Sequence, residues 1–208
     1  MTDRRAFLGA VATLSAGTML HLDGHAASDA WLDRLKGKHR QLFDAPDPEG
    51  GTILRHVRNY FDSWRDDYGV AERDVSVVIA LYARTTPLAL QDAMWAKYQL
   101  GAALNLTDPM TTAPLARNYF AHPQPGDPVA DGTPESSIES LQKRGAAFVV
   151  CNNALKRWSA RLEKEGKGSA AAIHDDLVAH VLPGVTVVPD VLIAMTKAHE
   201  RGFAYTRS

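Results

Sequence analysis

Short apolar runs of β-forming residues alternate with helix-type patterns along most of this chain, and this alternation limits the fold more than any other feature. The clearest runs are Val75 to Tyr82, Phe148 to Val150 and Val185 to Val188, and shorter ones are Gln41 to Asp44 and Phe203 to Tyr205. Continuous apolar runs are typical of strands buried on both faces of a parallel sheet. Because each strand is followed by a helix, the sequence predicts a three-layer α/β/α fold with a mainly parallel sheet of about five strands.

The size and charge of the chain limit its function further. With 208 residues, of which 45% are hydrophobic, it has material for one core, so residues 28–208 are predicted to form a single domain. The formal net charge is -1 and no basic stripe is present, which argues against nucleic acid as a partner. No Gly-x-Gly-x-x-Gly, Walker loop, Gly-x-Ser-x-Gly or zinc-ligand spacing occurs, so neither a metal site nor a cofactor is predicted.

The first residues are predicted to act as an export signal. Arg4 and Arg5 are followed by Phe7-Leu8, a moderately apolar stretch and small residues at Ala26 and Ala27. This pattern resembles a bacterial Tat leader, which implies the Tat translocase as a partner during export, cleavage near Ala26 or Ala27, and a periplasmic mature protein. The alternative is an uncleaved leader that acts as a membrane anchor, although the apolar stretch is shorter than the roughly 20 residues of a spanning helix.

The chain's one cysteine, Cys151, is the first candidate functional residue. It follows the strand that ends at Val150, and Asn152 and Asn153 then supply turn and N-cap chemistry for a helix carrying Leu155 on its apolar stripe. Open α/β sheets bind ligands at the carboxyl ends of their strands, and backbone N–H groups of a helix's first turn stabilise a thiolate. One cysteine makes no internal disulfide, so this thiol is reactive, paired with another molecule, or buried and inert.

A second strand-loop-helix unit supplies further candidates. The run Val75 to Tyr82 leads into a loop that contains Arg84 and Thr85, and Pro87 is predicted to open a helix from Leu88 to Leu100. Arg84 either meets an anion in the same crevice as Cys151 or is a solvated loop charge.

The longest irregular stretch is Leu106 to Asp131, which is rich in Thr, Asp and Pro. It also contains Tyr119 and Phe120, which are costly to leave in water. We therefore expect this loop to fold back as a lid or to form a subunit contact.

The segment Lys143 to Tyr205 resembles the DsrE/DsrF-like family. The resemblance rests on Val-Cys-Asn-Asn at the end of an apolar strand, Leu182-Pro183-Gly184-Val185, and Gly202-Phe203-Ala204-Tyr205, in that order. It implies a three-layer α/β/α domain, a homo-oligomer, and a persulfide carried on a cysteine that matches only Cys151. In that role Cys151 accepts sulfur from a donor protein and passes it to an acceptor.

Two other hypotheses stay open at this stage, and the residues do not decide whether the protein is an enzyme. In one, the protein is a binding module in which Cys151, Asn152, Asn153, Arg84 and Thr85 line a small anion or cofactor pocket. In the other, it is a partner-docking subunit in which Cys151 is only a core residue.

Overall fold

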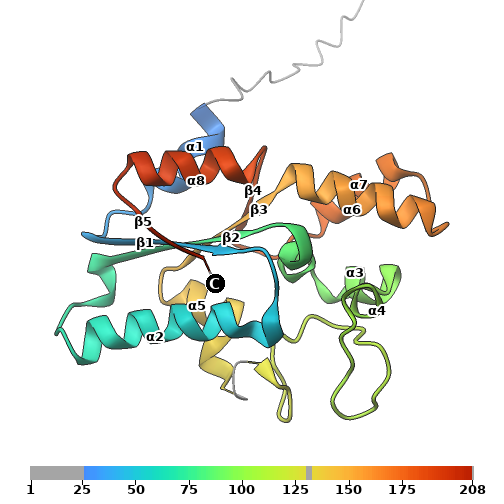
Figure 1. The fold of residues 1–208 in the computed structure, drawn as a ribbon, viewed down its shortest axis with the longest axis horizontal. Helices are drawn as coiled ribbons and strands as arrows, with labels where there is room; N and C mark the ends of the chain where they lie inside the picture. The colour runs from blue at the N-terminus through green and yellow to red at the C-terminus, as the bar shows by residue number, and fades with distance from the viewer. Residues whose placement is uncertain (1–25, 130–132, 208) are drawn as a thin grey trace, which may run out of the picture.

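The computed structural model describes residues 26–129 and 133–207, and it contains a five-stranded, all-parallel sheet in the order β4-β3-β2-β1-β5. Helices cover both faces of this sheet, so the predicted three-layer α/β/α fold is confirmed (Figure 1). The strands are β1 (His39–Ala45), β2 (Val75–Leu81), β3 (Ala147–Cys151), β4 (Val185–Val188) and β5 (Ala204–Arg207).

Helices connect successive strands, as parallel pairing requires. The α-helices of the described chain are α1 (Ala26–Asp33), α2 (Thr52–Asp66), α3 (Asp92–Tyr98), α4 (Leu100–Leu104), α5 (Ile138–Lys143), α6 (Asn152–Lys164), α7 (Ala170–Ala179) and α8 (Val191–Glu200). Short 3₁₀ helices include η3 (Ala83–Ala89), directly after β2. None of these helices is long and apolar enough to cross a membrane.

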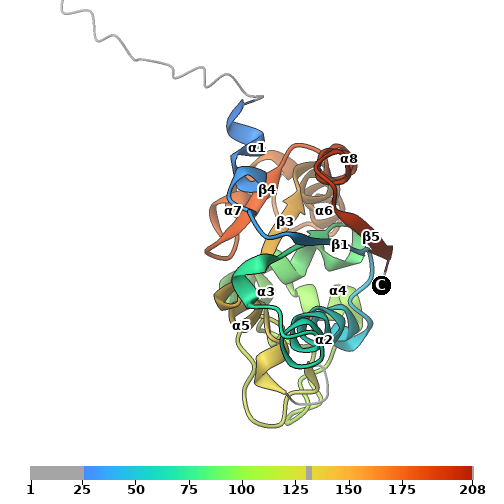
Figure 2. The same ribbon diagram turned by 90° about the vertical axis from the view of Figure 1, so that its left-hand side faces the viewer.

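The sheet separates two hydrophobic cores of unequal size. α2 and α5 lie on one face with the larger core, and α1 and α8 lie on the other with the smaller one (Figures 1 and 2). Alternation along β3 shows the division: Phe148 and Val150 belong to the larger core, whereas Val149 and Cys151 belong to the smaller one. Both faces of β2 are buried, which explains its unbroken apolar sequence.

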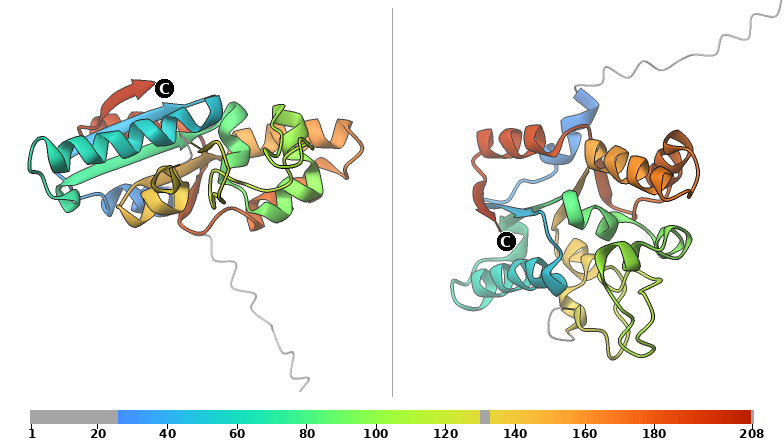
Figure 3. Two further views of the ribbon diagram at one scale, coloured as in Figure 1. Left: turned by 90° about the horizontal axis from the view of Figure 1, so that it is seen from below. Right: turned by 45° about the vertical axis from the view of Figure 1, so that its right-hand side comes forward.

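The long helix α2 shows why the sequence pattern was readable. Ile53, Leu54, Val57 and Phe61 recur at helical spacing and are all buried, and the helix runs alongside β1 and β2 (Figure 3, left). The helix begins at Thr52, directly after the left-handed Gly51.

Several local predictions are wrong in instructive ways. The helix expected from Leu88 to Leu100 is divided into η3, α3 and α4, because Pro87 lies inside a 3₁₀ turn and Gln99 adopts left-handed φ. Val185 to Val188 was expected to be a buried strand, but β4 is an edge strand whose first three residues are only half-buried.

The irregular segment after α4 folds back onto the domain, as its aromatic residues predicted. Tyr119 and Phe120 are buried in the larger core, with ring centroids 4.4 Å apart. The Asn118 side chain donates hydrogen bonds of 2.8 Å to the carbonyl oxygens of Leu88 and Leu90. Packing and hydrogen bonds therefore fix this segment without regular secondary structure, at the lower right in Figure 3 (right).

Candidate functional site

The loops that follow β2 and β3 lie side by side at the carboxyl edge of the sheet. Leu81 pairs with Val150 in the β2-β3 ladder, so the chain leaves the two strands at neighbouring points. One loop carries Arg84 and Thr85, and the other begins helix α6 directly after Cys151. The structure therefore brings the two sequence-predicted segments to one edge of the sheet, where α/β proteins bind ligands.

The turn after β2 has an unusual backbone. Ala83 adopts left-handed geometry with φ of 51°, which is unfavourable for a residue with a Cβ atom. Its carbonyl oxygen accepts hydrogen bonds from Trp158 Nε1 at 2.8 Å and from Thr86 Oγ1 at 3.1 Å. These contacts hold Ala83 in its strained conformation, and they fix the position of the following residue, Arg84.

Thr85 stabilises this turn from the interior of the protein. Its side chain is fully buried, and its hydroxyl contacts the carbonyl oxygens of Ala45 and Tyr82 while accepting a 3.0 Å hydrogen bond from the Tyr82 backbone N–H. Because the hydroxyl is occupied by backbone groups, Thr85 ties the ends of β1 and β2 together and does not line a pocket.

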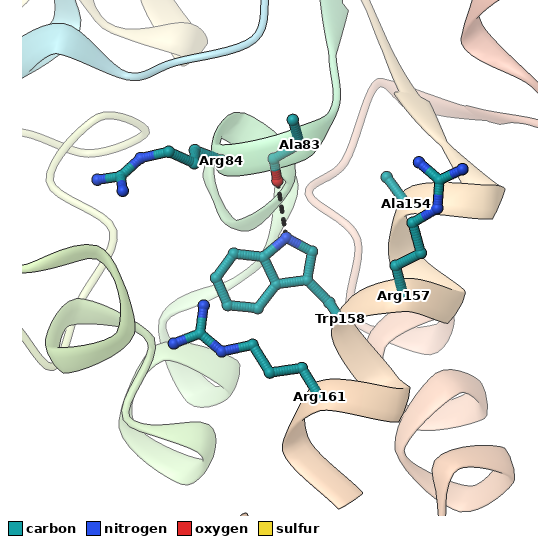
Figure 4. Close-up of a pocket in the computed structure, with 6 residues that line it drawn as sticks. All are labelled: Ala83, Arg84, Ala154, Arg157, Trp158 and Arg161. Carbon is teal, nitrogen blue, oxygen red and sulfur yellow. Dashed lines mark hydrogen bonds between the residues drawn. The ribbon is translucent and has the colours of Figure 1, made fainter. Parts of the chain in front are cut away.

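A pocket opens between this turn and helix α6. Its volume is about 260 Å³, and its lining includes three arginines, Arg84, Arg157 and Arg161, together with Trp158 (Figure 4). The two further lining residues are Ala83 and Ala154. Figure 4 shows the Arg161 guanidinium beside the indole ring, whereas the guanidinium groups of Arg84 and Arg157 extend away from the ring on opposite sides. The hydrogen bond from Trp158 to Ala83 holds the ring in place.

The three arginines differ in the partners they already have. Arg84 forms a 2.9 Å ion pair with Asp47, and Arg161 forms one of 3.0 Å with Glu165 while lying over the Trp158 ring at 5.2 Å. Within residues 26–129 and 133–207, Arg157 has no hydrogen-bond or ion-pair partner. The pocket therefore has three cations but two partner carboxylates, which leaves local positive charge for an anion.

Cys151 lies close to this pocket in sequence but is buried. Its side chain is 5% exposed and packs in the smaller core, and the residue itself is the N-cap of α6, so the prediction that Asn152 or Asn153 caps this helix is wrong. Ala154, one helical turn after Cys151, contributes to the pocket lining.

The two asparagines after Cys151 connect α6 to its neighbours. Asn152 Oδ1 lies 2.7 Å from His174 Nε2 on α7, and Asn153 Nδ2 donates a 3.1 Å hydrogen bond to Asp190, the N-cap of α8. Among the predicted ligand residues, the structure places only Arg84 in the pocket lining.

Sequence reasoning did not identify the pocket residues of α6. Arg157 and Arg161 are four residues apart and flank Trp158, so they lie on one side of the helix. The spacing of the two arginines was visible in the sequence. It indicates a binding pocket only because the turn after β2 packs opposite this side of α6. No group of three or more His, Cys, Asp or Glu residues able to hold a metal ion occurs in the described part of the chain.

A second polar cluster lies on the other face of the same edge. Asp44 is buried on β1 and accepts a 2.6 Å hydrogen bond from the Tyr205 hydroxyl, while its other carboxylate oxygen has no hydrogen-bond partner in the described chain. Partial burial, with hydrogen bonding to Asp44, raises the pKa of Tyr82 to about 12. The Tyr82 phenol is therefore neutral at physiological pH.

Comparison with known proteins adds little to this geometry. No protein-family model matches the chain, and no curated protein matches it. A solved structure with some similarity is that of MTH1491, a protein of unknown function from Methanobacterium thermoautotrophicum. The sequences are 16% identical, the TM-score is 0.44, and the alignment covers 82% of this chain and 99% of the other.

Proposed function

We propose that this protein binds a small anionic ligand in the pocket formed by Arg84, Arg157 and Arg161. The observation that carries the proposal is that these arginines, from two separate chain segments, line one pocket at the carboxyl edge of a parallel sheet. Guanidinium groups are strong, bidentate hydrogen-bond donors to carboxylate, sulfate and phosphate groups. The protein acts, in this proposal, as a binding module.

Two of the three arginines already form ion pairs and the third does not, and this difference suggests how a ligand is held. Arg157 has no competing partner in the described chain, so it is free to bind an incoming anion, whereas the Asp47 and Glu165 carboxylates hold Arg84 and Arg161 in position. The pocket volume of about 260 Å³ favours a small metabolite or inorganic oxyanion. Apolar surface from Ala83, Ala154 and Trp158 accommodates the uncharged part of such a ligand.

Ligand-dependent thermal stabilisation tests this proposal. The purified protein is heated with phosphate, sulfate and citrate at constant ionic strength, since a ligand at 100 times its dissociation constant stabilises by about 2.7 kcal/mol. Arg157→Gln should abolish the stabilisation. Arg34→Gln is the matched control, because Arg34 is also exposed, has no partner in the described chain, and lies outside the pocket.

The outcomes separate clearly. Stabilisation that is lost in Arg157→Gln and retained in both Arg34→Gln and Cys151→Ser supports anion binding at this pocket. Stabilisation that Arg34→Gln reduces equally is a general charge effect and contradicts the proposal. No stabilisation by any of these anions at millimolar concentration contradicts it too.

A second candidate function is sulfur transfer on Cys151, as the resemblance to the DsrE/DsrF-like family implies. The observation in its favour is that Cys151 ends β3 and caps the 13-residue helix α6 beside the pocket. In the reaction, the Cys151 thiolate attacks the outer sulfur of a donor persulfide, R–S–SH. The donor S–S bond breaks, the R–S⁻ thiolate leaves, and Cys151 becomes a persulfide without any external oxidant.

Intact mass spectrometry tests this second candidate. The protein is measured before and after exposure to polysulfide, with Cys151→Ser as the control. A mass gain in whole sulfur atoms, reversed by reductant and absent from the variant, identifies Cys151 as a sulfur carrier. Because the side chain is 5% exposed, the reaction requires local opening at the start of α6. A wild-type protein that gains no mass contradicts sulfur transfer and leaves the anion proposal intact.

Export through the Tat pathway, cleavage near Ala26 or Ala27 and a periplasmic location complete the proposal. The supporting residues Arg4 and Arg5 lie outside the described part of the chain. Replacement of both with lysine should trap the precursor in the cytoplasm, and unchanged export would contradict the assignment. A homo-oligomer is proposed from the family resemblance alone, and light scattering after size-exclusion chromatography measures it.

A further inference from the structure

Three aromatic side chains on α2 and the turn after it form a groove that the proposed function does not use. The groove has a volume of about 310 Å³ and is lined by Tyr60, Ser63, Trp64 and Tyr68. The first three follow helical spacing, so they share one side of α2. The His39 ring, at the amino end of β1, stacks against Trp64 with centroids 3.8 Å apart. This groove therefore lies at the opposite end of the strands from the arginine pocket.

The three rings that line the groove are inclined to one another. Tyr60 and Trp64 have centroids 6.1 Å apart and lie nearly perpendicular, at 81°. Trp64 and Tyr68 have centroids 5.1 Å apart at an angle of 50°. The Tyr68 side chain is 72% exposed, because no other segment of the described chain covers it. Because the three rings are inclined rather than stacked face to face, they do not cover one another fully and leave aromatic surface in the groove for a ligand.

The charge around the groove favours a cation. None of the four lining residues is charged, and the faces of aromatic rings carry negative electrostatic potential. Asp67 follows Trp64 by three residues and Ser63 by four, which places it on the same side of the helix. Within the described chain, the exposed Asp67 carboxylate forms no hydrogen bond or ion pair.

We propose that this groove binds a quaternary or N-methylated ammonium group, with Tyr60, Trp64 and Tyr68 around the cation and Asp67 as the counter-charge. Methyl groups make apolar contact with the ring faces and spread the positive charge over a surface that needs no hydrogen-bond acceptors. A primary ammonium group carries three hydrogen-bond donors and is strongly hydrated, so contact with the ring faces costs it more solvation than it costs a methylated cation. The groove therefore favours the methylated cation.

The test compares choline with 3,3-dimethyl-1-butanol, which has the same shape without the charge. Both are titrated into the protein by calorimetry at low ionic strength. Choline should bind about tenfold more tightly than the neutral analogue, as expected for a cation enclosed by aromatic rings. Equal affinity overturns the proposal, since the groove is then merely apolar. Tighter binding of a neutral oligosaccharide such as maltotriose also overturns it and identifies a sugar-stacking platform.

Variants locate the binding. Tyr68→Ala removes a largely exposed ring and should weaken choline binding several-fold without unfolding the protein, and Asp67→Asn should weaken it to a lesser degree. Met110→Ala is the matched control, because Met110 is 77% exposed and lies outside this groove. Choline affinity unchanged in Tyr68→Ala excludes this groove as the site. Arg157→Gln should leave choline affinity unchanged, so the outcome is independent of the anion proposal.

Discussion

The indole nitrogen of Trp158 donates a 2.8 Å hydrogen bond to the carbonyl oxygen of Ala83, across a sequence separation of 75 residues. This bond joins helix α6 to the strained turn after β2, and both sides of the arginine pocket depend on it. The pocket is therefore the product of two chain segments that meet only in the folded protein.

Trp158→Phe should loosen this junction. Phenylalanine keeps an aromatic ring but removes the N–H donor, so stability should fall by about 1 kcal/mol, the usual net contribution of such a bond. Denaturant unfolding measures the change, and anion affinity at the pocket should fall with it. Unchanged stability would mean that Thr86 alone satisfies the Ala83 carbonyl oxygen.

Ala83→Gly should stabilise the protein by roughly 0.5–1 kcal/mol, because glycine adopts left-handed φ without the Cβ clash. In an ordinary right-handed helix, replacing alanine with glycine lowers the stability of the protein instead. Ala160→Gly, at an exposed position in the interior of α6, is the matched control and should destabilise by about 1 kcal/mol. The idea fails if both variants are destabilised equally in thermal unfolding.

Thr85→Val should be strongly destabilising. The substitution keeps the side-chain volume but leaves the Tyr82 backbone N–H and the Ala45 carbonyl oxygen without the hydroxyl, which costs about 1–3 kcal/mol. Thr85→Ser retains the hydroxyl and should lose much less. A serine variant as unstable as the valine variant would show that the methyl group, and not the hydrogen bonding, is what matters.

Acid should weaken the irregular segment between α4 and α5 through Asp127. Burial raises the pKa of Asp127, but hydrogen bonds from Arg117 and the Gln124 backbone N–H outweigh it and leave the pKa below its ordinary value of 3.8. A carboxyl group with a lowered pKa stabilises the folded state above its unfolded value, and this stabilisation is lost as pH falls through the folded value.

Asp127→Asn should therefore destabilise the protein at pH 7 and remove part of the acid sensitivity below pH 4. Asp175→Asn is the control, because its side chain is 86% exposed. Unfolding free energies measured from pH 7 down to pH 3 give the comparison. Parallel curves for the wild type and Asp127→Asn would show that Asp127 contributes nothing to acid unfolding.

The strands were predictable because their signal is local. In β2, seven consecutive residues are buried, so the sequence is continuously apolar and needs no knowledge of distant contacts. The helix division after Pro87 was not predictable, since the Asn118 side chain, from a distant segment, binds the carbonyl oxygens of Leu88 and Leu90 there. Tertiary contacts there override the intrinsic preference for one continuous helix.

The sequence by itself determined the α/β/α architecture and placed Arg84 and Cys151 at the carboxyl ends of two strands, because residue periodicity records which faces are buried. Only the tertiary structure decided that Cys151 is buried, that the Thr85 hydroxyl is bound to backbone groups, and that Arg157 and Arg161 line one pocket with Arg84 and Trp158. The physical reason is that exposure and pocket geometry depend on which elements pack opposite a residue. The sequence of α6 around Trp158 and the sequence of the turn at Ala83, 75 residues earlier, give no indication that the two segments meet in the folded protein.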